Sequence, residues 1–148
     1  IPLRLVGSEM CIRDSPSGVR NMPVEINEVI SPLIFWKKEF REDSGGAGQY
    51  RGGLGQTIIL ANSQDKDFVF SATYERVIYP ARGRQGGESG KTGRLSLDDG
   101  TAVMAKGDTV IPAGRKLVIE FPGGGGLGPS SERDPKAKAR DKKLGYVN

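Results

Sequence analysis

The sequence predicts a mainly β fold, in which short antiparallel strands and hairpins are joined by Gly/Pro-rich loops and one short helix lies at the C-terminus. Glycine and proline are abundant, at 22 and 9 of 148 residues, which favours many turns over a helical bundle. The apolar runs are short, and several alternate with polar residues as half-buried strands do. A chain of this length can form one domain with a real core.

Residues 1–15 are expected to be a non-native leader. The stretch LVGSEMCIRDS has no hydrophobic periodicity and resembles the translation of sequencing-adapter read-through, and the chain begins with Ile1 rather than methionine. A genuine N-terminal extension is the alternative. We therefore divide the chain into this leader, a β-rich region over residues 16–133, and a helix with a tail over residues 134–148.

Four extended segments are expected in the first half of the chain. PVEINEVI (residues 23–30) alternates apolar and polar side chains like a half-buried strand. SPLIFWKKEF (residues 31–40) is rich in aromatic and β-branched residues, which favours an extended segment. GQTIILAN (residues 55–62) and FVFSATYE (residues 68–75) are predicted strands, and the short polar turn between them suggests a hairpin.

A second hairpin and a further strand are expected after residue 93. In RLSLDDGTAVMA, Leu95 and Leu97 alternate with polar residues, and Asp99-Gly100 is typical of a type I′ turn, after which the chain returns. Residues 116–121 form a predicted strand, which ends before the proline and glycines that follow.

The tail RDPKAKARDKKLGYVN changes character and predicts a helix over residues 135–144. Asp134 suits the N-cap, Pro135 the first helical position, and Gly145 the left-handed position after the helix. The tail is basic and carries most of the formal net charge of +4. Few aromatic residues accompany these lysines, so a solvated helix face is favoured over a nucleic-acid surface.

Composition narrows the chemistry that the chain can perform. The sequence contains no histidine, which excludes a Ser-His-Asp arrangement, a Cys-His pair and an imidazole metal ligand. A single cysteine excludes an internal disulfide and fits a reducing compartment. No apolar run is long enough to cross a membrane, so no membrane partner is expected.

Two glycine-rich stretches invite a phosphate-binding interpretation. FREDSGGAGQYRGGLGQ (residues 40–56) lacks the Gly-Lys-Ser/Thr end of a Walker loop. GGGGLG (residues 123–128) follows a strand, but no helix opens directly after it as a dinucleotide site requires. We therefore interpret both stretches as tight structural turns, which contain Gly45, Gly46, Gly52, Gly53, Gly55, Gly123, Gly124, Gly125 and Gly126.

Charged side chains near these loops are the remaining candidates for chemistry. Carboxylates in or beside strands can act in acid–base catalysis where burial shifts their pKa, but most such carboxylates are simply solvated. The carboxylates placed in this way are Glu25, Glu28, Glu75 and Asp108. Four arginines flank glycine turns and can donate hydrogen bonds to a carboxylate or carbonyl of a ligand, or alternatively form structural pairs within the protein. They are Arg20, Arg51, Arg76 and Arg82.

The order of several motifs adds a family resemblance over residues 16–148. The motifs are SGVRNMPVEINE, EFREDSGGAGQYRGGLG, YERVIYPARGRQGG and GDTVIPAGRKLVIEFPGGGGLGPSSERDP, followed by a short tail that ends in GYV. This succession resembles the C-terminal part of the hydantoinase B/5-oxoprolinase family. One departure is YPARGRQGG, which is more basic than the family's tryptophan-containing version and leaves the substrate open.

The resemblance implies part of an ATP-dependent enzyme that opens a cyclic amide, such as a hydantoin or 5-oxoproline. It implies a hetero-oligomer in which a hydantoinase A-type subunit or domain uses ATP and Mg²⁺. The lack of a visible targeting signal, together with the need for ATP, predicts a cytoplasmic location. It further implies that any divalent metal of the B subunit lies in a more N-terminal part. This chain is then expected to bind no cofactor and to be inactive alone. Relatives that carboxylate ketones share the same two-part plan.

Within that resemblance, Arg20, Asn21 and Arg51 are the residues expected to bind substrate or shape its cavity, because Arg and Asn can hold a polar carbonyl. The catalytic residues remain unassigned. Two other functions stay open: a subunit-interaction module without catalysis of its own, or part of an ATP-dependent ketone carboxylase. A nucleic-acid-binding domain is the weakest alternative, and it predicts binding that falls steeply with salt.

Overall fold

A computed structural model describes residues 23–147, so the predicted leader, Arg20 and Asn21 lie outside the described residues. The chain divides into two compact units, Ile1–Ser31 and Pro32–Asn148. The described part is mainly sheet, with short antiparallel strands and one short C-terminal helix, so the predicted fold class is confirmed.

The first unit contains a helix where the sequence pattern predicts a strand. Helix α1 (Val24–Ile30) begins after Pro23 and carries Glu25 in its first turn, where a carboxylate complements the helix dipole. No residue of α1 is buried, so its apolar alternation marks no sheet face. The prediction of a half-buried strand over residues 23–30 is wrong because so short an alternation also fits two helical turns.

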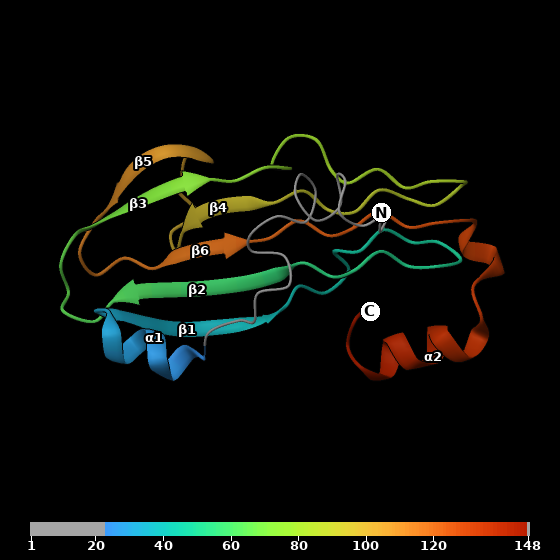
Figure 1. Cartoon of the computed structure of the whole chain (residues 1–148), viewed down its shortest axis with the longest axis horizontal. Coiled ribbons are helices and arrows are strands. Elements are labelled where there is room, and N and C mark those ends of the chain that lie inside the picture. Colours follow the sequence, from blue (N-terminus) through green and yellow to red (C-terminus); the bar gives the residue numbers. More distant parts are fainter. Residues whose placement is uncertain (1–22, 148) are drawn as a thin grey trace, which may run out of the picture. The chain divides into compact units, whose positions relative to one another are not determined.

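In the second unit a four-stranded antiparallel sheet has the order β1-β2-β6-β4 (Figure 1). Its strands are β1 (Leu33–Phe40), β2 (Gln56–Asn62), β4 (Arg94–Leu97) and β6 (Leu117–Glu120). β1 pairs with β2 along its whole length, with one irregularity between Phe35 and Lys37. These strands confirm the predicted extended segments at 31–40, 55–62 and 116–121.

A separate two-stranded sheet pairs β3 (Phe68–Thr73) with β5 (Lys106–Ile111). The strand at 68–75 is therefore confirmed, but the predicted hairpin between β2 and β3 is wrong. β2 pairs with β1 on one side and with β6 on the other, which leaves no side for β3. The chain therefore crosses to the second sheet through residues 63–67. β5 escapes the sequence pattern because Gly107 and Asp108 interrupt its apolar alternation.

The hydrophobic core lies between these two sheets. Five buried side chains form it, and they come from β3, β4, β5 and β6: Ala72, Leu95, Ile111, Leu117 and Ile119. Ile111 and Leu117 are completely buried. Partly buried side chains from β2, β3 and neighbouring loops pack against this cluster. Because the core is small, most of the second unit must be held by other contacts.

The second predicted hairpin is shorter than expected, and its turn is not type I′. A type I′ turn needs a positive φ at both central residues. Gly100 has a φ of 88°, whereas Asp99 is not among the residues with positive φ. The Asp99 carboxylate instead accepts from the Thr101 amide at 2.8 Å, and the return segment joins β4 through a single bridge between Ser96 and Ala102.

Helix α2 (Pro135–Lys143) confirms the predicted C-terminal helix and its caps. The Asp134 side chain accepts from the Lys136 amide, and Gly145 adopts a left-handed φ of 67°. A short 3-10 helix, η3 (Ser130–Glu132), precedes it. Among the described residues, no helix is long and apolar enough to cross a membrane.

Candidate functional site

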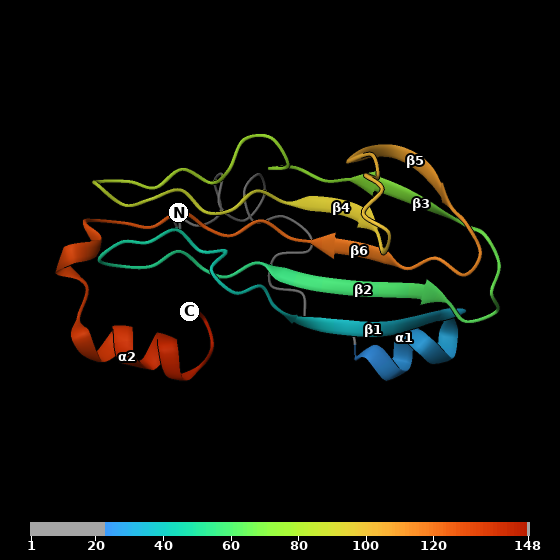
Figure 2. The same cartoon turned by 180° about the vertical axis from the view of Figure 1, so that it is seen from behind.

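Three glycine-rich segments run side by side beyond the ends of the strands and toward α2 (Figures 1 and 2). Main-chain hydrogen bonds tie them together: the Gly46 amide donates to the Gly124 carbonyl at 2.8 Å, and the Gly124 amide donates to the Gly53 carbonyl at 2.9 Å. The Gly126 amide donates to the Glu88 carbonyl at 2.8 Å. We call this assembly the glycine bundle; it consists of residues 44–55, 81–93 and 121–128.

The glycines of the bundle are needed because main chains approach one another too closely for side chains. A Cβ atom on Gly52 would overlap the Gly124 carbonyl, and one on Gly123 would overlap the Ser44 carbonyl. The same conflict with a main-chain carbonyl arises at Gly45, Gly46, Gly55, Gly125 and Gly126. None of the nine predicted loop glycines has a positive φ. Close main-chain approach, rather than a left-handed turn, is therefore what seven of these nine positions require.

Two members of that set are less crowded than the others. A Cβ on Gly53 would meet nothing within 4 Å, and one on Gly124 would lie 3.1 Å from the Gly53 nitrogen. Gly53 is also exposed, whereas Gly52 beside it is buried. The two neighbouring glycines thus differ sharply in what surrounds them.

Several glycine amides of the bundle already donate hydrogen bonds to main-chain carbonyls. A phosphate cradle presents several unpaired amide hydrogens to the anion. Here the amides of Gly46, Gly52, Gly123, Gly124 and Gly126 all donate to main-chain carbonyls at 2.8–3.0 Å. These five amides are therefore not available to an anion.

Arg51 lies at the far end of the bundle in a buried ion cluster. Its Nε donates to the Asp141 carboxylate of α2 at 3.2 Å, and Arg133 donates to the same oxygen at 2.5 Å. The side chains of Arg51, Arg133 and Asp141 are 14%, 16% and 10% exposed. The Arg51 guanidinium also lies over the Tyr146 ring, 5.3 Å from its centroid.

This cluster fastens α2 to the bundle, and two of its members, Arg133 and Asp141, were not predicted from the sequence. Asp141 is the only buried residue of α2, so it provides the helix with a specific anchor. Asp141 could have been noticed in the sequence because it is the sole acidic residue in a helix rich in Lys and Arg. A substrate-binding role for Arg51, Arg20 and Asn21 stays a prediction.

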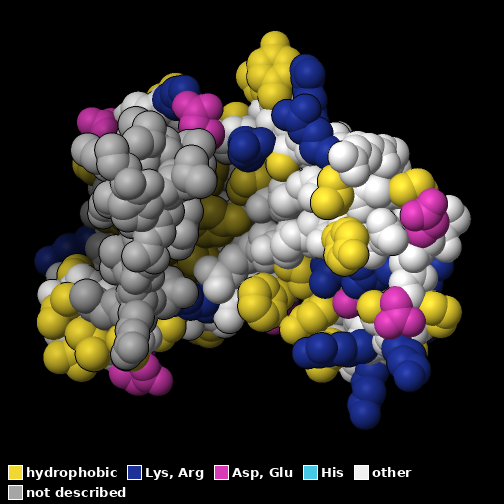
Figure 3. All heavy atoms as spheres, turned by 45° about the vertical axis from the view of Figure 1, so that its right-hand side comes forward, with side chains coloured by type: hydrophobic (Ala, Val, Ile, Leu, Met, Phe, Trp, Pro, Cys, Tyr) yellow, Lys and Arg dark blue, Asp and Glu magenta, His cyan; other side chains and the backbone are white. Residues whose placement is uncertain are grey.

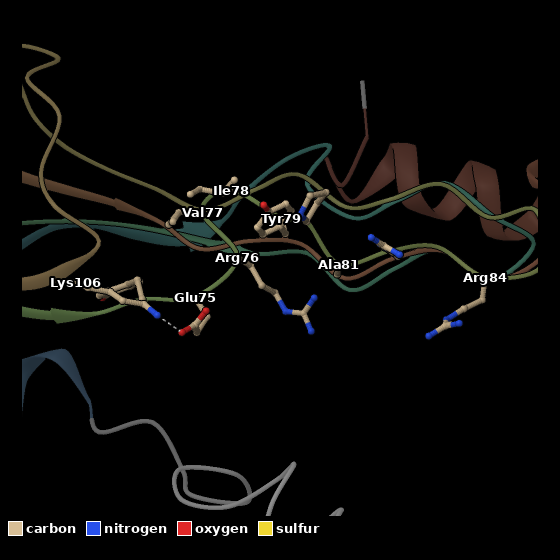
Figure 4. A pocket seen from close by; sticks show the side chains of 11 residues that line it. Glu75, Arg76, Val77, Ile78, Tyr79, Ala81, Arg84 and Lys106 are labelled. Atoms are coloured by element: carbon tan, nitrogen blue, oxygen red, sulfur yellow. Dashed lines mark hydrogen bonds and ion pairs between the residues drawn. The ribbon is translucent and has the colours of Figure 1, made fainter.

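A groove of about 660 Å³ lies along residues 74–84, which we call the arginine loop (Figure 4). The last four residues of this loop, 81–84, also belong to the glycine bundle. Arg76 and Arg84 extend to the same side of this loop, and Arg82 also lines the groove. All three arginines are exposed, and no described residue pairs with their guanidinium groups. Ile78 and Tyr79 are 74% and 79% exposed.

An ion pair closes one end of the groove. Lys106 Nζ lies 2.6 Å from Glu75 Oε1, as the dashed line in Figure 4 shows. The hydrogen bond and the charge of Lys106 hold the pKa of Glu75 below its ordinary value, so this exposed carboxylate is ionised and paired. Asp108 is likewise engaged, because it accepts from the Ser71 hydroxyl.

The described carboxylates do not gather into a metal site. Within residues 23–147, no group of three or more His, Cys, Asp or Glu side chains is placed to hold a metal ion. Two groups of ionisable side chains lie next to the glycine bundle, namely the Arg51–Asp141–Arg133 cluster and the groove of the arginine loop.

A family model described as Hydantoinase B/oxoprolinase matches residues 7–130 of the chain. Among curated relatives, 5-oxoprolinase PfmaA of Pestalotiopsis fici is 33% identical and covers 85% of this chain, which spans 10% of that protein. 5-oxoprolinase 1 of Arabidopsis thaliana is 34% identical and covers 76% of this chain, which spans 9% of its length.

Two solved structures share the fold. An ATP-dependent caprolactamase from Pseudomonas jessenii superimposes with a TM-score of 0.71 and 22% identity, over 89% of this chain and 24% of its own. An acetone carboxylase, solved in a nucleotide-free state, gives a TM-score of 0.64 and 20% identity, over 86% of this chain and 22% of its own. The chain thus spans less than a quarter of each of these proteins.

Proposed function

Because the chain belongs to the hydantoinase B/oxoprolinase family, we propose that it supplies the C-terminal β-rich part of an ATP-dependent enzyme that opens a cyclic amide. The family match over residues 7–130 carries this proposal. A hydantoin or 5-oxoproline is the proposed substrate. The likeness to a caprolactamase adds support for the fold alone.

The chemistry of a cyclic amide explains why such an enzyme needs ATP. Resonance makes the ring carbonyl a poor electrophile, and a phosphorylated carbonyl oxygen becomes a leaving group. Five glycine amides of the bundle already donate to main-chain carbonyls, which favours a nucleotide site outside these loops. We therefore place ATP and Mg²⁺ in a hydantoinase A-type part, and any divalent metal in a more N-terminal portion of the B part. No step of the reaction is assigned to residues of this chain.

On this proposal the chain contributes a scaffold and is inactive alone. The glycine bundle fixes the arginine loop on one side and the anchor of α2 on the other, through contacts that involve main chain and buried charge. The complete enzyme is proposed to be a cytoplasmic hetero-oligomer of A-type and B-type parts. An interaction module without catalysis of its own is the alternative for this chain.

The test is ATP turnover by the complete gene product together with its A-type partner. We expect ATP hydrolysis that depends on hydantoin or on 5-oxoproline, and no turnover by the 148-residue chain. Turnover that depends on acetone and bicarbonate would instead assign the parent to ketone carboxylation. Binding of the A-type partner without any effect on its ATPase would support the interaction module.

A further inference from the structure

The arginine loop carries free charge that its own unit does not neutralise. Four basic side chains and one carboxylate line the groove, and the carboxylate is taken up by Lys106. The guanidinium groups of Arg76, Arg82 and Arg84 therefore face solvent together without a described partner. An acidic surface would supply the opposite charge that these guanidinium groups do not find among the described residues.

Large apolar side chains accompany these cations. Ile78 and Tyr79 are about three-quarters exposed, and Val77 lines the same groove. Figure 3 shows apolar and basic side chains next to each other on one face of the molecule. Tyrosine and arginine beside aliphatic residues are typical of the centre of a protein interface.

The loop is held in place rather than left to fold on contact. The Tyr74 amide donates to Ala105 at 2.8 Å, and the Gly93 amide donates to the Arg76 carbonyl at 2.9 Å. The Arg84 amide donates to the Gly126 carbonyl at 2.9 Å, which ties the far end to the glycine bundle. A loop fixed in this way loses little conformational entropy when it binds.

The backbone conformation of Arg76 in the arginine loop is strained. Its φ is 60°, in the left-handed region that arginine rarely adopts. Such strain persists where the surrounding contacts determine the conformation, and it concentrates at functional positions. Here the strained residue is also the first of the three free arginines.

We propose that the arginine loop is a docking surface for an acidic, apolar surface on the remainder of the same polypeptide in the complete protein. Aspartate or glutamate side chains would meet the three guanidinium groups, and an apolar hollow would receive Ile78 and Tyr79. The chain spans only 24% of the caprolactamase chain and about a tenth of the 5-oxoprolinase, so most of such a polypeptide lies outside it. This inference rests on the chain being one part of a larger enzyme, not on the reaction.

Hydrogen exchange of the amides of residues 76–84 tests this inference without measuring turnover. We expect these amides to exchange at least about tenfold more slowly in the complete protein, without its A-type partner, than in the 148-residue chain. In the complete protein, the double variant Arg82→Glu/Arg84→Glu should lose that protection. The matched control is Lys66→Glu/Lys136→Glu, which reverses the same charge at two exposed positions outside the groove.

Three results would overturn the inference. Equal exchange in the complete protein and in the chain would mean that the loop stays open to solvent. Protection that survives Arg82→Glu/Arg84→Glu, or that the control removes equally, would mean that the loop arginines do not recognise an acidic surface. Protection that appears only after an A-type subunit is added would place the acidic surface on a different polypeptide.

Discussion

Replacing Gly52 with alanine is expected to destabilise the chain strongly, whereas the same change at Gly53 is not. A Cβ on Gly52 would overlap the Gly124 carbonyl and lie 2.9 Å from the Gly125 oxygen. Both obstacles are main chain, so no side-chain rotation relieves them. The 121–128 segment must move away, and the hydrogen bonds that join it to the 44–55 segment must stretch or break.

The size of the effect follows from those contacts. Overpacking in a close-packed region costs about 1–3 kcal/mol. The two hydrogen bonds of Gly124, to Gly53 at 2.9 Å and from Gly46 at 2.8 Å, contribute about 1 kcal/mol each. The Gly52→Ala variant should therefore lose roughly 3–5 kcal/mol of unfolding free energy, which corresponds to a fall in Tm of about 10 °C.

Gly53→Ala is the matched control, one residue away. Its Cβ would enter open space, and its φ is not positive. Alanine restricts the unfolded chain, so Gly53→Ala should leave the stability unchanged or raise it by about 0.4–1 kcal/mol. Urea denaturation of the 148-residue chain measures both variants. If their unfolding free energies fall within about 1 kcal/mol of each other, close main-chain approach is not what the Gly52 position requires.

Three further predictions concern buried or paired polar groups. Asp141→Asn leaves two guanidinium groups without their shared carboxylate, so the unfolding free energy should fall by about 3 kcal/mol. Limited proteolysis should then cut α2 first, and an α2 that stays protected would contradict its role as an anchor. Ser44→Ala removes a completely buried hydroxyl that accepts a hydrogen bond from the Gly55 amide at 2.8 Å. Urea denaturation should show that the unfolding free energy falls by about 1–3 kcal/mol, and it would not fall if water replaced the hydroxyl. Lys106→Gln should raise the pKa of Glu75 toward its ordinary value in a carbon-detected NMR titration. Because the pKa of Glu75 is lowered in the folded chain, its pairing with Lys106 stabilises the chain at pH values above the ordinary carboxylate pKa, and this stabilisation is lost as the pH falls through the lowered pKa. An unchanged pKa of Glu75 in the variant would exclude Lys106 as the cause.

Local patterns were enough to predict most strands and the C-terminal helix. The strands at 31–40, 55–62 and 116–121 are long or apolar enough for their pattern to decide their structure. The N-cap, first-position proline and left-handed glycine of α2 are local signals as well, and all three are confirmed. These features depend on residues close in sequence, which a single sequence displays.

The helix at 24–30 and the turn at Asp99-Gly100 are local errors, whereas the other errors arise where the outcome depends on distant partners. Pairing of β2 with β6 rather than β3 brings Thr57 opposite Glu120, and no local signal in residues 63–67 reveals that choice. The bundle is equally hidden: glycines that pack against other main chains look the same in the sequence as glycines that turn. The Arg51–Asp141 pair spans 90 residues, so neither side chain points to the other in the sequence.

The bundle links stability to recognition in this fold. A hydrophobic core of five buried side chains cannot by itself fix loops that extend beyond the strands, whereas main-chain hydrogen bonds between adjacent glycine segments can. One of those bonds, from the Arg84 amide to the Gly126 carbonyl, also sets the position of the arginine loop. A side chain at Gly126 would overlap the Ala47 carbonyl and displace that anchor, so the same substitution that loosens the bundle should also disorder the docking surface. Preorganisation of the three free arginines is therefore a consequence of glycine packing against the main chain of Arg82 and Arg84.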